Sequence, residues 1–373
     1  MTTIYLIRHA QADGNLYRRC QSWYDSLVTP IGYQQIEALK NRFADTHFDA
    51  VYSSDLFRTM TTAKAICEPH NLPLITDPEL REINCGRWED FPWGILLQQE
   101  RESMLEFWRC DPKWQVDGSE TFEEIRLRFD RAVKRIASRH PNQTIAIFAH
   151  GCIIRSTLAY WFGLPCSQIR EVPHGDNTSV ARLEYSDDSI RVCWYNNTDH
   201  LTGELAHAPH PAAETDEATA ARIEQASVYF RPFDPSVDSD AYWAAYEATH
   251  HLQLDDIDRM KILEAAQDAC TRNPGNLSIA MLNGTEIGLV ELDTSKTDHD
   301  VGLIKLMYLN PAHQRRKLGV QLIGQAVSHF RALERQFVCV NLPDANMTVS
   351  NFFKKYGFNP SDQPGEFKKY IGY

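Results

Sequence analysis

Three short apolar runs, separated by helical patterns, constrain the fold of this chain more than any other feature. The runs have strand length and cover Thr3–Ile7, Ala50–Tyr52 and Thr144–Ala149. Such runs are typical of strands in a parallel sheet that is buried on both faces. Between them, Thr121–Arg139 begins with a capping-box pattern and repeats apolar residues at helical spacing. The alternation of strands and helices predicts an α/β domain with a mostly parallel sheet.

A change in composition divides the chain near its middle. From His207 to Ala221 the sequence lacks apolar periodicity and combines prolines with small and acidic residues, which is typical of a linker. A surface helix from about Glu214 is the alternative. We therefore expect a first domain at residues 1–205, a linker at 206–226 and a second domain at 227–373. Strands and helices are also predicted in the second domain: strands at Ser227–Phe233, Leu277–Leu282, Glu286–Leu292 and Gly302–Leu309, and helices at Asp240–His251 and Asp256–Thr271.

Composition and charge exclude several classes of function. With 38 basic and 50 acidic residues the net charge is −12, and both halves are acidic, so neither offers the basic face that nucleic-acid binding needs. No apolar run reaches the roughly 20 residues of a membrane span. The N-terminus fits a strand better than a signal peptide. Nine cysteines without a Cys-x-x-Cys pair indicate neither a disulfide framework nor a zinc site. We expect a cytoplasmic protein that binds neither membrane nor nucleic acid.

Each of the three apolar runs is followed by residues suited to phosphate. Arg8-His9 follows the first run, Arg58 lies shortly after the second, and His150-Gly151 follows the third. Ligands of open α/β sheets bind beyond the carboxyl ends of the strands, so these residues are expected to meet in one pocket. Taken singly, Arg-His fits a solvated loop and His-Gly fits a turn; their corresponding positions favour a phosphate site.

The residue types in this pocket suit a phosphomonoester. Arginine and imidazole donate hydrogen bonds to a dianionic phosphate, and a neutral imidazole is a nucleophile available near pH 7. No metal-ligand spacing is visible in the sequence. The hypothesis is therefore a metal-independent phosphatase with a side-chain nucleophile.

These motifs resemble the histidine phosphatase (phosphoglycerate mutase-like) superfamily over residues 1–205. The resemblance rests on ordered segments at the family's spacing: Leu6–Ala10 with Asn15, then Gln21, Asp25, Thr29 and Gly32, then Ser53–Ala63, Arg81–Glu89 and Ala149–Gly151. Two residues depart from the pattern, because Ala10 and Cys152 stand where glycine is common. The resemblance implies a three-layer α/β fold.

The same resemblance implies a role for each site residue. His9 becomes phosphohistidine; Glu82 protonates the leaving oxygen and then activates water; Arg8, Arg58 and His150 hold the phosphoryl oxygens; Asn15 and Gln21 lie at the substrate rim. On the residues alone, Glu82 fits an exposed carboxylate before a turn, and Asn15 fits a helix cap or a turn.

The segment around Glu82 looks like the branch of the family that dephosphorylates small metabolites. We therefore expect a small phosphorylated metabolite as substrate; a mutase-type phosphoryl transferase and a non-catalytic phosphometabolite sensor are the alternatives. The tryptophan-rich stretch Trp88–Trp114 either covers the pocket as a lid or packs in the interior.

The second half resembles the GNAT acetyltransferase superfamily over about residues 227–373. Gln314-x-x-Lys317-x-Gly319 looks like the loop that binds the pyrophosphate of acetyl-CoA, with Lys317 in place of the first glycine; a basic helix start is the alternative. In the final helix, Asn346 and Phe353 would face the cofactor.

The GNAT resemblance implies an α+β domain with a mixed sheet, an acetyl-CoA site and an unknown amine acceptor. A non-catalytic acyl-CoA-binding module that regulates the phosphatase is the alternative. The implied cofactor contacts are Gln314, Arg315, Arg316, Lys317, Leu318, Gly319, Asn346 and Phe353.

Overall fold

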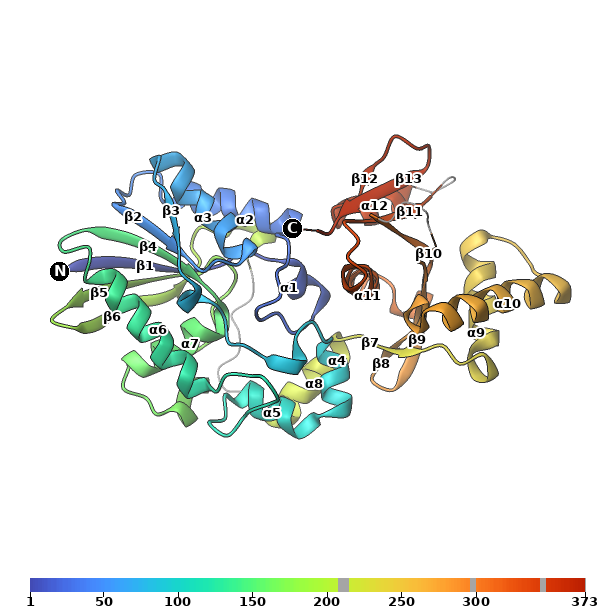
Figure 1. Ribbon diagram of the computed structural model, residues 1–373, viewed down its shortest axis with the longest axis horizontal. Helices are drawn as coiled ribbons and strands as arrows, with labels where there is room; N and C mark the ends of the chain where they lie inside the picture. Colours follow the sequence, from blue (N-terminus) through green and yellow to red (C-terminus); the bar gives the residue numbers. More distant parts are fainter. Residues whose placement is uncertain (207–214, 296–299, 343–346, 373) are drawn as a thin grey trace. The chain divides into compact units, whose positions relative to one another are not determined.

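The computed structural model describes residues 1–206, 215–295, 300–342 and 347–372, and the chain divides into two compact units (Figure 1). The first unit comprises Met1–Asn15, Cys20–Phe91 and Gln99–Ala220, and the second comprises Leu16–Arg19, Pro92–Gln98 and Ala221–Tyr373.

The first half of the chain alternates strands and helices. Its strands are β1 Thr2–Arg8, β2 Ala50–Ser53, β3 Leu74–Thr76, β4 Thr144–Ala149, β5 Val180–Ser186 and β6 Ser189–Asn197. Its helices are α1 Asp13–Tyr17, α2 Pro30–Arg42, α3 Phe57–His70, α4 Trp93–Gln99, α5 Arg101–Arg109, α6 Phe122–Ala137 and α7 Gly151–Trp161.

The first unit is a three-layer α/β structure, as the family resemblance implies. Its sheet has the order β3-β2-β4-β1-β5-β6, in which β3, β2, β4 and β1 are parallel and β5 and β6 are antiparallel. α2 and α3 cover one face and α6 and α7 the other (Figure 1). The three apolar runs are β1, β2 and β4, which explains why their side chains are buried on both faces.

Two local predictions in the first half can be compared with the structure. The capping box of α6 is confirmed, because the Thr121 hydroxyl accepts from the Glu124 N–H and the Glu124 carboxylate accepts from the Thr121 N–H. The lid interpretation of the tryptophan-rich stretch is wrong for Trp88 and Trp114. Both are 0% exposed, and their ring centroids lie 5.4 Å apart within an aromatic cluster that includes Phe107.

The segment expected as a linker contains a helix. α8, Asp216–Ala226, occupies its second half, so the alternative of a helix from about Glu214 agrees with the structure. Residues 207–214 lie outside the described part of the chain. The domain boundaries themselves stay a prediction.

The second half of the chain contains a mixed sheet, as expected of an α+β domain. Its strands are β7 Tyr229–Pro232, β8 Leu277–Leu282, β9 Thr285–Asp293, β10 Val301–Leu309, β11 Phe337–Asn341, β12 Asn359–Pro360 and β13 Glu366–Tyr370. Its helices are α9 Pro235–His250, α10 Asp256–Arg272, α11 Gly319–Ala332 and α12 Met347–Lys355.

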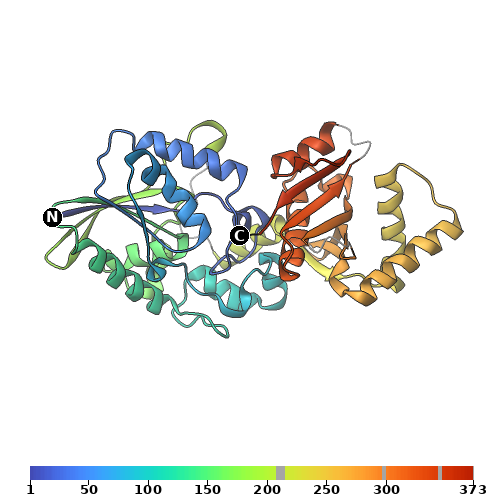
Figure 2. The same cartoon turned by 45° about the horizontal axis from the view of Figure 1, so that its top comes forward.

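The strands of the second sheet follow the order β12-β13-β11-β10-β9-β8-β7. β10 and β11 are parallel, and the other neighbouring pairs are antiparallel. α9 and α10 pack on one face, and α11 and α12 pack on the other (Figure 2). Two hydrophobic cores, one on each face, therefore hold this sheet in place.

Candidate active site

The parallel strands of the first sheet bring four of the sequence-predicted residues to one edge. Arg8 is the last residue of β1 and His9 follows it, His150 lies between β4 and α7, and Arg58 is in the first turn of α3 after β2. The rings of His9 and His150 lie 5.3 Å apart between centroids. His9, Arg58 and His150 are at most 4% exposed. The residues that were expected to meet at the strand ends therefore lie together.

The tautomer of His9 is fixed by one hydrogen bond. Its Nδ1 lies 2.7 Å from the carbonyl oxygen of Ala10, and because a carbonyl can only accept, Nδ1 carries the hydrogen. In the neutral ring the lone pair is then on Nε2. Nε2 is the atom that can attack phosphorus.

A chain of hydroxyl groups orients His150. Its Nε2 lies 2.7 Å from Ser54 Oγ, which lies 2.7 Å from Thr59 Oγ1. Thr59 donates to the Leu56 carbonyl at 2.7 Å, so Ser54 donates to Thr59 and accepts from Nε2. His150 Nδ1 is buried without a hydrogen-bond partner among the described residues. In the neutral ring Nδ1 then has the lone pair, and it can donate to a phosphoryl oxygen only when the ring takes up a second proton, which a bound anion favours.

Both arginines also keep a buried donor without a partner. Arg58 donates from Nη2 to the Ser22 carbonyl at 2.6 Å and from Nη1 to the Tyr24 carbonyl at 3.2 Å. Arg8 donates to the Gly175 carbonyl. Within the described chain, Nε of each arginine is buried and unpaired. Unpaired buried donors are costly, and an anion in the pocket would satisfy them.

Burial sets the charge of the two imidazoles. It lowers the pKa of His9 well below the usual value of about 6.5, and the charges of Arg58 and Arg8 lower it further. The pKa of His150 is lowered well below its usual value by burial first and then by Arg58, His9 and Arg8. Both rings are therefore neutral near pH 7 without a bound anion, and His9 has the neutral form that a nucleophilic imidazole needs.

Glu82 is buried at the start of α7 rather than exposed before a turn. It is 8% exposed. Its Oε1 accepts from the N–H groups of Ile83 at 3.0 Å and Ile153 at 2.8 Å, and its Oε2 accepts from that of Cys152 at 2.9 Å. The electrostatic influence of Glu82 on both Arg8 and Arg58 places its carboxylate beside the cationic pocket.

The two departures from the family pattern leave the site intact, because both residues contribute only backbone groups. Ala10 accepts from His9 and donates its N–H to Thr62 Oγ1 at 2.9 Å, and its φ is not positive. Cys152 supplies its N–H to Glu82. At Gly151 a Cβ would lie 2.8 Å from the His174 ring and 3.0 Å from Arg8 Nε, so a side chain there would displace these site residues.

Asn15 and Gln21, expected at the substrate rim, have local partners. Asn15 Oδ1 accepts from the Ala12 N–H at 3.1 Å, which fits the turn interpretation of this residue. Gln21 Nε2 donates to Ser26 Oγ at 2.5 Å, and within the described chain its Oε1 is buried without a partner. Their contact with substrate stays a prediction.

His174 and Asn177 are site residues that the sequence analysis missed. His174 Nδ1 lies 3.3 Å from Arg8 Nη1, and Asn177 Nδ2 donates to the His9 carbonyl at 3.0 Å. They precede β5, which runs antiparallel to β1, so the start of β5 lies beside the end of β1. An antiparallel pairing of β5 with β1 was the missing signal, and the sequence alone does not reveal it.

The second candidate site is the loop before α11. Residues 314–317 are exposed, Leu318 is 2% exposed, and α11 begins at Gly319. Arg315 and Lys317 both have a φ of 60°, between residues of negative φ. Alternation of right- and left-handed residues can turn successive N–H groups toward one side, as in anion-binding loops. Lys317 thus adopts the backbone conformation that favours the glycine it replaces.

Of the other two residues expected at the cofactor, the structure describes one. Phe353 is 3% exposed and packs in the core against Phe352 and Phe358, so its expected contact with the cofactor is corrected to packing. The aromatic residue beside the loop is Phe352, because a Cβ at Gly319 would lie 3.3 Å from its ring. Asn346 lies outside the described residues.

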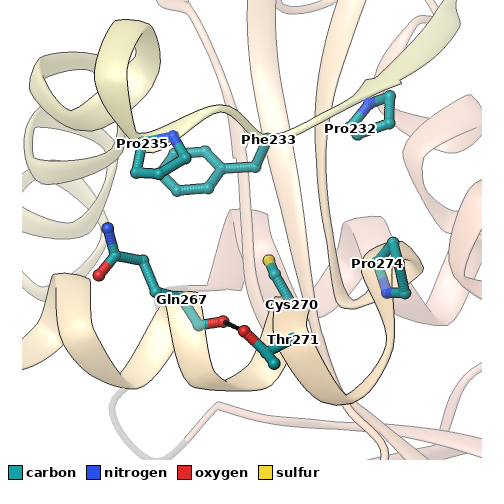
Figure 3. Close-up of a pocket in the computed structure, with 7 residues that line it drawn as sticks. All are labelled: Pro232, Phe233, Pro235, Gln267, Cys270, Thr271 and Pro274. Carbon is teal, nitrogen blue, oxygen red and sulfur yellow. Dashed lines mark hydrogen bonds between the residues drawn. The ribbon is translucent and has the colours of Figure 1, made fainter.

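A separate pocket of about 450 Å³ lies in the second unit (Figure 3). Phe233 and Cys270 lie on opposite walls, and Gln267 and Thr271 lie along α10 (Figure 3).

Across the described ranges, no group of three or more His, Cys, Asp or Glu is placed to hold a metal. In the same part of the chain, no helix has the length and apolar character needed to cross a membrane.

Comparison with known proteins agrees with this geometry. The family model of the histidine phosphatase superfamily (branch 1) matches residues 4–198, more than half of the chain, and the model of the acetyltransferase (GNAT) domain matches residues 273–360. The chain therefore belongs to the histidine phosphatase superfamily and carries a GNAT domain.

Two similar proteins cover the first half of the chain. The protein named "Probable phosphoglycerate mutase GpmB" of Yersinia pestis (strain Pestoides F) is 28% identical over 215 residues, which are 57% of this chain and 98% of that protein. The structure of YhfR from Bacillus stearothermophilus has 28% identity and a TM-score of 0.52, and the match covers 54% of this chain and 99% of that one.

Proposed function

We propose that the first unit is a metal-independent phosphomonoesterase that acts on a small phosphorylated metabolite through a phosphohistidine on His9. The observation that carries this proposal is the tautomer of His9. The Nδ1 bond to Ala10 leaves a lone pair on Nε2, in a buried neutral ring beside two guanidinium groups. That combination is a nucleophile facing an anion site.

The reaction proceeds in two displacements. Nε2 of His9 attacks phosphorus, the bond to the leaving oxygen breaks, and Glu82 supplies the proton which that oxygen needs. Arg8, Arg58 and His150 stabilise the charge on the phosphoryl oxygens. Glu82 then takes a proton from water as the water attacks phosphorus. The P–N bond breaks, and inorganic phosphate leaves.

Assays on the full chain test this proposal. Phosphate release from a panel of phosphorylated metabolites is expected to continue in EDTA, because side chains supply the nucleophile and the charges. Loss of activity in EDTA with recovery on adding a divalent ion would contradict the metal-independent mechanism.

A mutase-type phosphoryl transferase is the second candidate, favoured by the name of the Yersinia relative. Both mechanisms share the phosphohistidine and differ in the acceptor of the phosphoryl group. Incubation with a phosphoglycerate separates them: a phosphatase yields glycerate and inorganic phosphate, whereas a mutase yields the isomeric phosphoglycerate.

For the second unit we propose an acetyl-CoA-dependent N-acetyltransferase whose cofactor pyrophosphate binds at residues 314–319. The support is the exposed loop with alternating φ at the start of α11, to which Arg315, Arg316 and Lys317 add positive charge. Calorimetry on the full chain should show coenzyme A binding that weakens with salt. Lys317→Ala should weaken it, whereas Lys355→Ala on α12 should not. Absence of binding in the folded wild type would contradict the proposal.

A further inference from the structure

A buried carboxylate lies inside the second unit, on the face of the sheet that α9 and α10 cover. Glu291 on β9 is 1% exposed. Its cross-strand partners are Leu277 on β8 and Leu306 on β10, and both are buried. A buried charge is expensive, and a well-packed apolar residue in its place is often as stable or more stable. Packing alone therefore does not account for a glutamate at this position.

Two donors contact the Glu291 carboxylate within the described chain. The Tyr242 hydroxyl donates to Oε2 at 2.9 Å, and Lys305 Nζ donates to Oε1 at 2.6 Å. A carboxylate has about four acceptor positions, so further N–H donors can be accommodated. The Tyr242 side chain is 0% exposed, whereas the Lys305 side chain is 41% exposed. The Tyr242 hydroxyl is thus held in place beside Glu291, whereas the Lys305 ammonium can leave Glu291 and move into solvent.

Lys305 stands where β10 separates from β11. The parallel pairing of the two strands ends at Ile304 and Val340, although β10 continues to Leu309. At the same point the β9–β10 register shifts between Ile304 and Leu306, so Lys305 is the extra residue of a bulge, which re-aims a side chain. The freed edge of β10 leads from Lys305 toward the loop at 314–319.

The helix above the carboxylate adds polar groups without adding charge. Tyr242, Tyr246 and His250 are spaced by four residues along one side of α9. The His250 ring lies 4.3 Å from that of Tyr246 between centroids. Burial lowers the pKa of His250, and its effect outweighs the opposing charge of Glu291. The imidazole is therefore neutral near pH 7 and does not compete as a cation.

The pocket of the second unit lies beside this cluster. Phe233 lines the pocket and lies 5.7 Å from Tyr242 between ring centroids. Cys270 lines it too, and Glu291 contributes to the raised pKa of its thiol after burial (Figure 3).

We propose that Glu291 is the acceptor site of the second unit: it binds the ammonium group of a primary-amine acceptor, and Lys305 occupies this place until the acceptor displaces it. This proposal rests on the proposed acetyltransferase function. In the reaction, Glu291 takes one proton from the acceptor ammonium. The neutral amine forms a bond to the thioester carbonyl carbon, the C–S bond breaks, and the second amine proton passes to the sulfur as coenzyme A leaves. Glu291 returns its proton to solvent.

Binding of n-butylammonium to the full chain, measured by calorimetry, tests the site without a known acceptor. Lys305→Ala removes the ammonium group that contacts Glu291. This variant should bind n-butylammonium at least about tenfold more tightly than the wild type does, which is the gain expected from one charge-assisted hydrogen bond. Glu291→Gln in the Lys305→Ala background should abolish the gain. Tetramethylammonium, which has no N–H group, should not bind more tightly.

A matched control removes another lysine of a salt bridge. Lys261 pairs with the exposed Asp258 on α10 at 3.2 Å, and Lys261→Ala should create no site. Lys305→Met, which keeps an apolar stem, should behave as Lys305→Ala does. Equal n-butylammonium binding in the wild type and both Lys305 variants would overturn the proposal. Failure of both variants to fold would also overturn it, because an exchangeable occupant cannot be essential to the fold.

Coenzyme A binding by the same samples separates this proposal from the one on which it rests. Coenzyme A binding without ammonium binding contradicts only the acceptor assignment. Ammonium binding without coenzyme A binding contradicts the cofactor site. With acetyl-CoA and n-butylamine, release of the coenzyme A thiol should rise in Lys305→Ala and fall in Glu291→Gln.

Discussion

The two proposed anion sites of this chain are built in opposite ways. The phosphate pocket of the first unit consists of buried side chains, with Arg58 and His150 both 0% exposed. The loop before α11 is exposed and offers backbone N–H groups. Buried charged side chains interact strongly with a bound anion, which also satisfies their unpaired donors. In an exposed loop that binds through backbone N–H groups, replacing one side chain changes binding little. Substitutions should therefore have large effects on catalysis in the first unit and small effects on binding in the second.

The largest effect is expected for His9→Ala, which removes the nucleophile. Phosphatase activity should fall by roughly 10⁴-fold or more, because His9 supplies the nitrogen that attacks phosphorus. Steady-state phosphate release with p-nitrophenyl phosphate measures this. Retention of most of the activity would show that the nucleophile lies elsewhere.

Glu82→Gln should produce a loss that depends on the leaving group. Alkyl phosphates need a proton on the departing oxygen and should lose about 10²–10⁴-fold, whereas p-nitrophenyl phosphate should lose much less. Arg58→Ala should depress both substrates together, since it contacts the group they share. A uniform loss in Glu82→Gln would contradict its role as a proton donor.

The pH dependence of kcat/KM should show the lowered pKa values of the imidazoles. An imidazole free in solution is neutral only above its usual pKa of about 6.5, but burial and then Arg58 and Arg8 lower the pKa of the nucleophile His9. After correction for ionisation of the substrate, kcat/KM should stay level as the pH falls through 6.5 and decrease only below it. A half-loss at about pH 6.5 would indicate an exposed, unperturbed nucleophile.

The smallest effect is expected for Lys317→Gly in the exposed loop. Glycine adopts a positive φ without the penalty that lysine meets at 60°, so the variant should be more stable by about 1 kcal/mol. Chemical denaturation measures this change. Tighter coenzyme A binding would mean that Lys317 only strains the loop, whereas weaker binding would mean that its ammonium contacts phosphate.

The sequence predicted those parts of the fold and the site that depend on a local pattern of residues. Apolar runs identified β1, β2 and β4, and the residues after them identified Arg8, His9 and His150. It missed His174 and Asn177, because their place depends on the antiparallel direction of β5.

Two further features could not be predicted from local sequence, because only the folded chain shows which side chains are buried and which lie together. The tryptophan-rich stretch was open to two interpretations, because aromatic residues serve lids and cores equally; the burial of Trp88 decided between them. Glu291 carried no sequence signal at all. The role proposed for Glu291 rests on its burial and on its hydrogen bonds with Tyr242 and Lys305, which lie 49 and 14 residues away along the chain.

The chemistry assigned to His9 is tested most directly by the position of the phosphoryl group in the phosphoenzyme. A single turnover is stopped in alkali, which preserves phosphohistidine, and the enzyme is analysed by ³¹P NMR and peptide mass spectrometry. Since Nδ1 of His9 donates to the Ala10 carbonyl at 2.7 Å, the phosphoryl group should be on Nε2 of His9 and absent from His9→Ala. A phosphoryl group on Nδ1, on another residue, or on none during turnover would contradict the account.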